Sequence, residues 1–494
     1  MTTNVILRAD ATPRMGTGHV MRSLALAQAA QDQGLEIRFV GRVHVPWVRE
    51  RLCAECIPLL ELADAVAHEE NPAELLHQLT QTGFAPSDTW VVLDGYHFTC
   101  ACQSAVRQAG YRLLVIDDYA HLPEYNCDIL LNQNPGAEDL TYAGAIGRKL
   151  LGPRYALLRR EFREARERLP HTKRNVPPKN ILVTLGGGDF IEHLGDIAQN
   201  MSIPAMKGRT VRVIQGAMDA ERIKQAFANC PASLEILPRV TDMPTLLLET
   251  DLCITAGGST CWELCCLEVP FLTVEVAENQ HELVRIIEEN GTAARFRVST
   301  WQTALHAMQL TAAAPTTADG KGAPRALAEC LTCLRDVTEA DMEFLFQLVN
   351  RPSIRAVSFH TAPIPWEEHV RWFCERLRQK LPFFIMEYNR TPCGYIRFSG
   401  NAGSIEVSIA ICPEARGKNA ALVGLRQACR RIFAQAYADT EIHAFVKCAN
   451  ITSMKFFECA GFTRLADSQS AARHVAHFTL FSASPRDEQP CLHP

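Results

Sequence analysis

The chain has 494 residues, 47% of them hydrophobic, and a formal net charge of -5 at pH 7. This length favours about three domains, and a slightly acidic chain lacks the overall electrostatic footprint of a nucleic-acid-binding protein. We find neither an apolar run of the ~18 residues that cross a membrane nor a secretory signal at the start of the chain. We therefore expect a cytoplasmic globular protein without nucleic-acid or membrane partners.

The 19 cysteines are expected to be reduced thiols, because no secretory signal directs the chain to an oxidising compartment. Two C-x-x-C pairs, Cys53/Cys56 and Cys330/Cys333, each stand far from a second pair. We interpret them as buried or incidental thiols and expect no structural zinc site. The cysteines of residues 261–266 share one predicted helix and are expected in the core.

Strands and helices alternate over the first 310 residues. In the first part a helix runs from His19 to a Gly34 cap, and the predicted strands are 5–8, 37–40, 90–93 and 112–116. After a linking helix that begins near Glu161, the predicted strands of the second part are 181–185, 211–214, 234–237, 252–255 and 271–274. This alternation implies parallel sheets. The sequence thus predicts two Rossmann-like domains, 1–165 and 166–310, with a ligand cleft between the carboxyl ends of their strands.

Residues 311–329 are small, polar and rich in Pro and Gly, and we interpret them as a linker. Residues 330–483 have a different order, in which two helices precede an antiparallel-like run of strands, and this order predicts an α+β domain. Residues 484–494 are expected to be a disordered tail.

A glycine-rich turn follows the first predicted strand. Residues 8–27 read R-A-D-A-T-P-R-M-G-T-G-H-V-M-R-S-L-A-L-A, in which Gly16 and Gly18 precede a helix that begins near His19. Glycines let the backbone approach a ligand closely, and a helix N-terminus offers unpaired amides and a positive dipole. Because that dipole disfavours an imidazolium, we expect His19 to be neutral at pH 7 and able to accept a proton from water. A helix-capping or packing role is the alternative.

Two further glycine turns follow strands of the second part. One is Thr184–Asp189, and the other is A-G-G-S-T-C-W-E at residues 256–263, which opens a helix. Both can present backbone amides to a diphosphate. Glu263 could bridge a ribose diol as a two-oxygen acceptor, and E-N-Q at 278–280 follows the next strand.

These motifs resemble the nucleotide-binding half of MurG-like UDP-sugar glycosyltransferases of the GT-B superfamily. Residues 8–27, together with V-V-L-D-G-Y-H-F (91–98), I-D-D-Y-A (116–120) and L-N-Q-N-P (131–135), resemble the UDP-sugar hydrolases of pseudaminic acid biosynthesis. The resemblance covers about residues 1–310. It implies a GT-B arrangement and the metal-independent release of UDP from a UDP-linked 2,4-diacetamido-2,4,6-trideoxy-altrose.

The resemblance also implies the residues of the site. His19 matches the family's catalytic histidine, which positions and partly deprotonates a water that attacks C1 with inversion, and Asn279 matches an asparagine near the sugar and the diphosphate. The other implied UDP-sugar contacts are Asp10, Gly16, Gly18, Arg22, Asp94, Tyr96, Gly187, Gly257, Gly258, Ser259, Thr260, Glu263 and Gln280.

Two motifs in the last domain resemble the GNAT N-acetyltransferases. They are G-S-I-E-V-S-I-A-I-C-P-E-A-R-G-K-N-A-A (403–421) and N-I-T-S-M-K-F-F-E-C-A-G-F (450–462), and the resemblance covers about residues 332–482. It implies acetyl-CoA as co-substrate, with the pyrophosphate on backbone amides at a helix start. Glu406 matches a base that acts through water, with a solvated strand residue as the alternative. The implied acetyl-CoA contacts are Ile409, Ile411, Arg416, Gly417, Lys418, Asn419, Ala421, Asn450 and Ser453.

Two positions depart from the GNAT pattern. Asn419 replaces a central glycine, although Asn tolerates a left-handed backbone better than most residues. Phe457 stands where the family usually has a Tyr that protonates the leaving thiolate, and Phe cannot donate a proton. A degenerate GNAT domain that only binds substrate or stabilises the other domains is therefore an alternative.

Together the motifs predict a two-activity enzyme of pseudaminic acid and surface-glycan synthesis. It would N-acetylate the 4-amino group of a UDP-sugar precursor and then hydrolyse the product, with other nonulosonic acid enzymes as candidate partners. Two alternatives stay open: a UDP-sugar glycosyltransferase that uses a sugar acceptor in place of water, and a UDP-sugar sensor without turnover.

Overall fold

The computed structural model describes residues 3–12, 15–63, 68–169, 177–306, 318–401, 403–434, 440–466 and 474–481, apart from the side chains of Asn279 and Asn401. The chain divides into two compact units, Thr3–Ala326 and the part from Leu327 onward. The predicted tail 484–494 lies outside the described residues. Within the part that the structure describes, no helix combines the length and the apolar character needed to cross a membrane.

The first sheet of the N-terminal unit has seven parallel strands in the order β3-β2-β1-β4-β5-β6-β7. They are β1 (Asn4–Ala9), β2 (Glu36–Gly41), β3 (Leu59–Glu61), β4 (Thr89–Asp94), β5 (Arg112–Ile116), β6 (Tyr125–Asn132) and β7 (Gly144–Leu151). The strands β3, β6 and β7 were not predicted. Because the chain builds β2 and β3 on one side of β1 and β4 on the other, the carboxyl ends of β1 and β4 form a topological switch point, where open α/β sheets bind ligands.

Four helices connect these strands. They are α1 (Gly18–Gln31), α2 (Pro46–Ala54), α3 (Pro72–Thr80) and α4 (Cys100–Gln108). Side chains of α3 and α4 pack on one face of the sheet in a common core with β1, β2, β4 and β5. The helix α1 contacts β1, β2 and β4, so its first turn is carried to the switch point.

The second sheet is also parallel, in the order β10-β9-β8-β11-β12-β13. Its strands are β8 (Asn180–Thr184), β9 (Thr210–Ile214), β10 (Ser233–Leu237), β11 (Leu252–Ala256), β12 (Phe271–Val274) and β13 (Ala294–Arg295). All but β13 match the predicted strands to within one or two residues. The switch point here lies between β8 and β11, which are the strands that the two predicted glycine turns follow.

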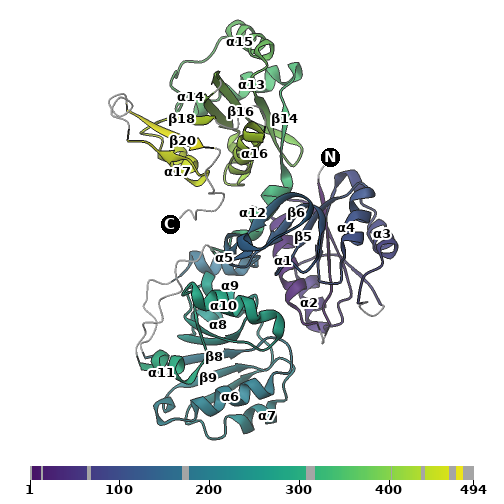
Figure 1. The fold of residues 1–494 in the computed structure, drawn as a ribbon, viewed down its shortest axis with the longest axis vertical. Helices are drawn as coiled ribbons and strands as arrows, with labels where there is room; N and C mark the ends of the chain where they lie inside the picture. Colours follow the sequence, from purple (N-terminus) through teal and green to yellow (C-terminus); the bar gives the residue numbers. More distant parts are fainter. Residues whose placement is uncertain are drawn as a thin grey trace. The chain divides into compact units, whose positions relative to one another are not determined.

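Helices cover both faces of the second sheet (Figure 1). On one face α6 (Ile191–Met201), α7 (Ala220–Ala226) and α11 (Val298–His306) pack together. The other face is covered by α5 (Arg160–Glu167), α8 (Met243–Leu248), α9 (Thr260–Cys266) and α10 (His281–Glu289). The three cysteines of α9 are buried, as predicted.

The predicted linker 311–329 differs from the structure in its second half. Residues 307–317 lie outside the described residues, but α12 (Gly322–Leu331) is a helix that crosses the boundary at Ala326/Leu327. Ala318 is buried in the core beneath α5, and a Cβ on Gly322 would lie 2.2 Å from the Ala156 carbonyl oxygen. The alanine-rich stretch after Gly322 favours a packed helix, which the small-residue composition of the segment concealed.

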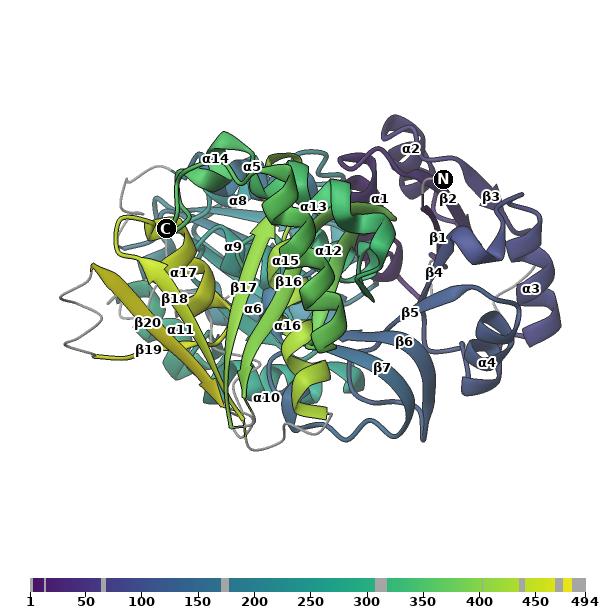
Figure 2. The same ribbon diagram turned by 90° about the horizontal axis from the view of Figure 1, so that it is seen from above.

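The C-terminal unit contains a mixed sheet in the order β14-β15-β16-β17-β18-β20-β19 (Figure 2). The strands are β14 (Thr332–Asp336), β15 (Phe383–Tyr388), β16 (Thr391–Asn401), β17 (Ser404–Ile411), β18 (Glu441–Lys447), β19 (Thr463–Arg464) and β20 (Val475–Phe481). Neighbouring strands are antiparallel except β17 and β18. That parallel pair joins only at Ser404–Glu406 and Glu441–His443, and the two strands separate toward their carboxyl ends.

Helices cover each face of this sheet. On one face lie α16 (Ala420–Ala434) and α17 (Ile451–Cys459). On the other lie α13 (Met342–Val349), α14 (Pro352–Arg355) and α15 (Trp366–Gln379). The predicted α+β order is confirmed, and the strands β14, β19 and β20 complete the sheet at its edges.

Candidate functional site

His19 and Asp94 meet at the switch point of the first sheet. His19 lies in the first turn of α1, and Asp94 is the last residue of β4. The His19 Nδ1 lies 2.7 Å from the Asp94 Oδ1. The Asp94 side chain is fully buried, whereas that of His19 is 12% exposed. An added Cβ at Gly18 would meet nothing within 4 Å, so the space beside the helix start is open.

The contact with Asp94 determines which nitrogen of His19 carries the proton. Burial alone would raise the pKa of Asp94, but the charge of Arg22 and the contacts with His19 outweigh burial and hold this pKa at about 2. The carboxylate is therefore ionised and can only accept. Nδ1 also lies 3.2 Å from the Arg22 Nη2, which can only donate, but the Asp94 oxygen is closer at 2.7 Å, so we assign the hydrogen of the ring to Nδ1. Within the described part of the chain Nε2 has no hydrogen-bond partner, and it is left as the proton acceptor of a neutral ring.

Arg22 stands between two carboxylates. Its guanidinium donates to Asp94 at 2.6 and 2.7 Å and to Asp118 at 2.7 and 2.9 Å. The two carboxylates raise the pKa of Arg22 although burial opposes this. Tyr96 donates its hydroxyl hydrogen to the Asp118 Oδ2 at 2.6 Å, and its ring meets that of His19 edge-on at 5.2 Å. Three residues predicted from the sequence thus lie around His19, namely Arg22, Asp94 and Tyr96. Arg22 and Asp94 are hydrogen-bonded to each other.

Sequence analysis missed Asp118, Tyr119 and His121 as parts of this site. They lie just after β5, in or next to the I-D-D-Y-A motif, and the ring of Tyr96 contacts both Tyr119 and His121. Asn134 donates to the Asp118 backbone oxygen at 3.1 Å. The available signal was the position of these polar residues directly after strands β5 and β6, which follow β4 in the sheet.

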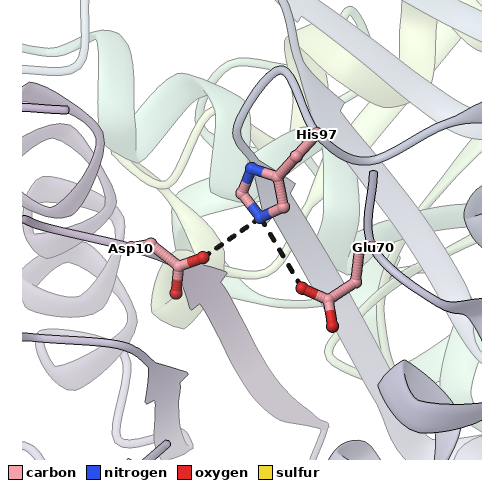
Figure 3. Close-up of side chains that lie close together, drawn as sticks. All are labelled: Asp10, Glu70 and His97. Atoms are coloured by element: carbon pink, nitrogen blue, oxygen red, sulfur yellow. Dashed lines mark ion pairs between the residues drawn. The ribbon is translucent and has the colours of Figure 1, made fainter. Parts of the chain in front are cut away.

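Asp10 lies in a separate buried network behind the switch point (Figure 3). With Glu70 and His97 it forms the one group of three or more potential metal ligands found among the described residues. Two arginines already fill this group: Arg8 donates to Asp10 at 2.5 Å and to Glu70 at 3.0 Å, and Arg42 donates to Glu70 at 2.7 Å. The two positive charges balance the two carboxylates, so these side chains form an ion-pair network. Asp10 is fully buried in it.

The glycine turns of the second sheet lie at its switch point, as predicted. After β11, Gly257 is held against α10, where an added Cβ would lie 2.5 Å from the Val284 Cγ2. Added Cβ atoms at Gly187 and Gly258 would meet nothing within 4 Å. Ser259 and Thr260 open α9. The turns therefore combine one glycine required by packing with two beside open space.

Glu263, expected at a ribose, is paired with an arginine. Its Oε1 accepts from the Arg159 Nη2 at 2.9 Å. Burial raises the pKa of Glu263 although Arg159 opposes this. Gln280 uses its side-chain oxygen to accept from the Val276 backbone N–H at 3.3 Å. Asn279 belongs to the short helix η5 (Glu278–Gln280), and its side chain lies outside the described part of the structure.

In the C-terminal unit the basic turn before α16 has the left-handed backbone that its glycine pattern requires. Gly417 has φ of 76° and Asn419 has φ of 58°, so the expectation that Asn419 replaces glycine in a left-handed conformation is confirmed. Arg416, Gly417 and Lys418 are exposed, and Ala421 is in the first turn of α16. Such a turn can present several amides to an anion.

Glu406 lies at the last paired position before β17 and β18 separate, opposite His443. It is exposed. Beyond it, β17 continues without β18, and Ile409 and Ile411 are partly buried against the core under α16. The strand therefore has an unpaired edge from Val407 onward on the side of β18, where an extended ligand can take backbone hydrogen bonds.

Three C-terminal motif residues serve the fold of α17. The Asn450 side chain accepts from the Ser453 backbone N–H at 3.1 Å and caps the helix. Phe457 is 5% exposed and packs against Phe462 and Phe478 in the core. A phenylalanine at this position is thus part of the packing and leaves the thiolate of a bound thioester without a donor from this residue.

Comparison with known proteins distinguishes the C-terminal unit from the N-terminal unit. Residues 332–463 match the model of the Acetyltransferase (GNAT) domain. The C-terminal unit is a GNAT acetyltransferase domain. The family implies an acetyl-CoA co-substrate, and the left-handed turn at Gly417–Asn419 and the open edge of β17 fit such a ligand.

Two relatives cover the N-terminal unit. The UDP-2,4-diacetamido-2,4,6-trideoxy-beta-L-altropyranose hydrolase of Campylobacter jejuni is 22% identical over 59% of this chain and 99% of its own length. An uncharacterized protein of Methanocaldococcus jannaschii is 22% identical over 93% of this chain and 96% of its own length. The crystal structure of MurG from Acinetobacter baumannii covers 66% of this chain and 98% of its own, with 16% identity and a TM-score of 0.44. The predicted order of two parallel Rossmann-like sheets followed by an α+β GNAT domain is confirmed.

Proposed function

We propose that the N-terminal unit hydrolyses UDP-2,4-diacetamido-2,4,6-trideoxy-β-L-altropyranose to UDP and the free sugar, and that the GNAT domain N-acetylates the 4-amino precursor of that substrate. The observation that carries the first part is the His19–Asp94 pair, which leaves a proton-accepting Nε2 at the start of α1. Its support is the similarity of this unit to the Campylobacter hydrolase along that protein's whole length.

In the proposed hydrolysis, His19 Nε2 accepts a proton from a water molecule whose oxygen attacks C1 of the sugar. The bond from C1 to the diphosphate oxygen breaks, and its electron pair leaves with UDP, a good leaving group that needs no strong acid. Asp94 stabilises the imidazolium that forms, as an acceptor on its Nδ1 side. The proton then passes to solvent. A single displacement inverts C1, and none of these steps requires a metal.

The glycine turns after β8 and β11 are proposed to bind the diphosphate of UDP. Gly187, Gly258, Ser259 and Thr260 supply the backbone amides, and Glu263 supplies the acceptor for the ribose. The pairing of Glu263 with Arg159 supports this role, because an arginine that already holds one carboxylate oxygen leaves the other for a hydroxyl donor. Asn279 and Gln280 are proposed to lie at the sugar and diphosphate.

For the GNAT domain, the turn from Arg416 to Asn419 is proposed to bind the pyrophosphate of acetyl-CoA, with Ile409, Ile411 and Ala421 along the pantetheine. Bound there, acetyl-CoA supplies an activated acetyl thioester. Glu406 is proposed to take a proton, through water, from the 4-ammonium group of the UDP-sugar. Acetylation comes first in this sequence of steps because the hydrolase substrate already carries both acetamido groups.

One experiment tests both activities with the full chain. The UDP-linked 4-amino sugar is supplied with acetyl-CoA, and free CoA and free UDP are followed over time. We expect CoA to appear first and UDP to follow. His19→Ala should release CoA but no UDP, and Glu406→Gln should slow CoA release without slowing UDP release from the diacetamido sugar. UDP release that stays normal in His19→Ala contradicts the hydrolase proposal.

The same assay separates the two alternatives. A glycosyltransferase would release UDP from the diacetamido sugar only after a sugar acceptor is added, and a sensor would bind the UDP-sugar and return it unchanged. Free UDP and free sugar in equal amounts, without any acceptor, support hydrolysis.

A further inference from the structure

A second histidine–aspartate pair lies one aromatic ring away from His19. His121 Nδ1 lies 2.5 Å from the Asp117 Oδ2, just after β5. The ring of Tyr96 lies 5.2 Å from that of His19 and 5.3 Å from that of His121. Both histidine rings therefore contact the ring of Tyr96.

Asp117 holds His121 in one orientation. Its Oδ1 accepts from the backbone N–H groups of Tyr119 at 2.8 Å and Ala120 at 2.6 Å, and its Oδ2 accepts from the Tyr125 hydroxyl at 2.6 Å as well as facing His121. Burial raises the pKa of Asp117, but the contacts with His121 and Tyr125 outweigh it and lower that pKa. An ionised carboxylate only accepts, so the hydrogen of a neutral His121 ring lies on Nδ1.

The Nε2 of His121 has no hydrogen-bond partner among the described residues. The side chain is 9% exposed, and among the described residues Nε2 is a buried atom without a hydrogen-bond partner. Buried polar atoms are rarely left unpaired, and those that are call for a functional explanation. The rings of Tyr96 and Tyr119 lie beside it, and Tyr119 is 42% exposed, so this part of the wall faces solvent.

We propose that His121, oriented by Asp117, is the sugar-recognition residue of the N-terminal site, and that its Nε2 accepts a hydrogen bond from an N–H or O–H of the nucleotide-linked sugar. Tyr96 and Tyr119 provide the apolar wall against which a deoxy sugar packs. Binding sites combine such aromatic surfaces with a few fixed polar groups that determine orientation. This inference rests on the proposed function for the identity of the ligand, but it assigns to His121 a binding role and not a role in activating water.

Two substitutions separate recognition from packing. The amide nitrogen of Asn can replace Nδ1 as a donor, and the amide oxygen of Gln can replace Nε2 as an acceptor. His121→Asn therefore keeps the contact with Asp117, while His121→Gln keeps an acceptor toward the ligand. His77→Gln, at an exposed histidine of α3, is the matched control. Circular dichroism and thermal melting show whether each variant folds.

The measurement is the Kd of UDP and of the UDP-diacetamido sugar by calorimetry, with full-length protein that also carries His19→Ala to prevent turnover. We expect His121→Asn to weaken binding of the UDP-sugar about 10- to 100-fold, the loss typical when a buried hydrogen-bond partner is removed. UDP itself should bind within about twofold, His121→Gln should lose less than His121→Asn, and His77→Gln should match the parent.

The inference is overturned if both His121 variants bind the UDP-sugar like the parent, if His121→Gln is the more damaging one, or if UDP binding falls equally. These results do not depend on hydrolysis, because binding is measured with protein that carries His19→Ala. If wild-type protein binds the UDP-sugar with this pattern but releases no UDP, the proposed hydrolysis fails and the recognition role stands. If wild-type protein hydrolyses the UDP-sugar and the variants do not show this binding pattern, the recognition role of His121 fails and the proposed hydrolysis stands.

Discussion

Replacing Asp94 by Asn changes the partner of His19 with little change in size. A carboxamide can turn its NH2 group toward Nδ1, which must then accept, and the hydrogen of the neutral ring moves to Nε2. In that tautomer Nε2 cannot take a proton from water. General-base catalysis contributes about 10²- to 10⁴-fold to a rate, so we expect kcat for UDP release to fall by that factor.

The same substitution has a structural cost that can be worked out from the pKa of Asp94. A pKa of about 2 in the folded protein, against 3.8 for a free carboxyl, corresponds to about 2 kcal/mol of additional stabilisation of the ionised form. Asp94→Asn loses this stabilisation and leaves Arg22 with Asp118 as its charged partner. We expect a decrease of about 2–3 kcal/mol in the free energy of unfolding at pH 7, which a domain of ordinary stability tolerates.

The assay is steady-state UDP release from the diacetamido sugar together with calorimetric binding of UDP and chemical denaturation. Glu36→Gln is the control, because it removes an exposed carboxylate at the opposite end of the sheet. Binding of UDP should be nearly unchanged, since UDP is proposed to bind at the glycine turns of the second sheet. A folded Asp94→Asn protein with kcat within threefold of wild type would refute the argument that Asp94 sets the tautomer of His19.

Three further predictions follow from particular contacts. Because its pKa is lowered on folding, Asp94 stabilises the protein above about pH 4 and loses this effect as the pH falls toward 2. Denaturation curves between pH 5 and pH 3 should therefore show a smaller loss of stability for Asp94→Asn than for wild type. An identical loss in the two proteins contradicts the assignment. Gly257→Ala should lower stability by about 1–3 kcal/mol and weaken UDP binding, because its Cβ would lie 2.5 Å from the Val284 Cγ2. The Cβ of Gly258→Ala would meet nothing within 4 Å, so this variant should not lose stability through packing. Equal melting temperatures of the two variants would contradict the prediction. Asn419 has φ of 58°, a backbone conformation that a β-branched residue disfavours. Asn419→Gly should therefore bind CoA at least as tightly as wild type, and Asn419→Val should bind it about tenfold more weakly. Calorimetry with CoA measures both affinities, and equal values in the two variants would refute the role of the turn.

The local parts of both sites could be predicted from the sequence because short runs of consecutive residues determine their backbone conformation. Glycines before a helix start define the turn at Gly16–His19, and the turns after β8 and β11 follow continuous apolar runs of buried parallel strands. Asn419 could be placed in a left-handed conformation from the motif alone. These features depend on backbone conformation over a few residues, which sequence patterns report directly.

Tertiary structure decided which distant side chains meet. Asp94 reaches His19 and Arg22, and Asp118 reaches Arg22, because the strand order places β4 beside β1 and β5 beside β4. No local pattern contains that order. The same cause explains why His121 was not recognised and why Asp10 turned out to be an internal ion-pair residue. The length of chain between such residues carries no information on their distance, whereas the sheet topology places them at one edge, where Asp94 lies in hydrogen-bond contact with His19.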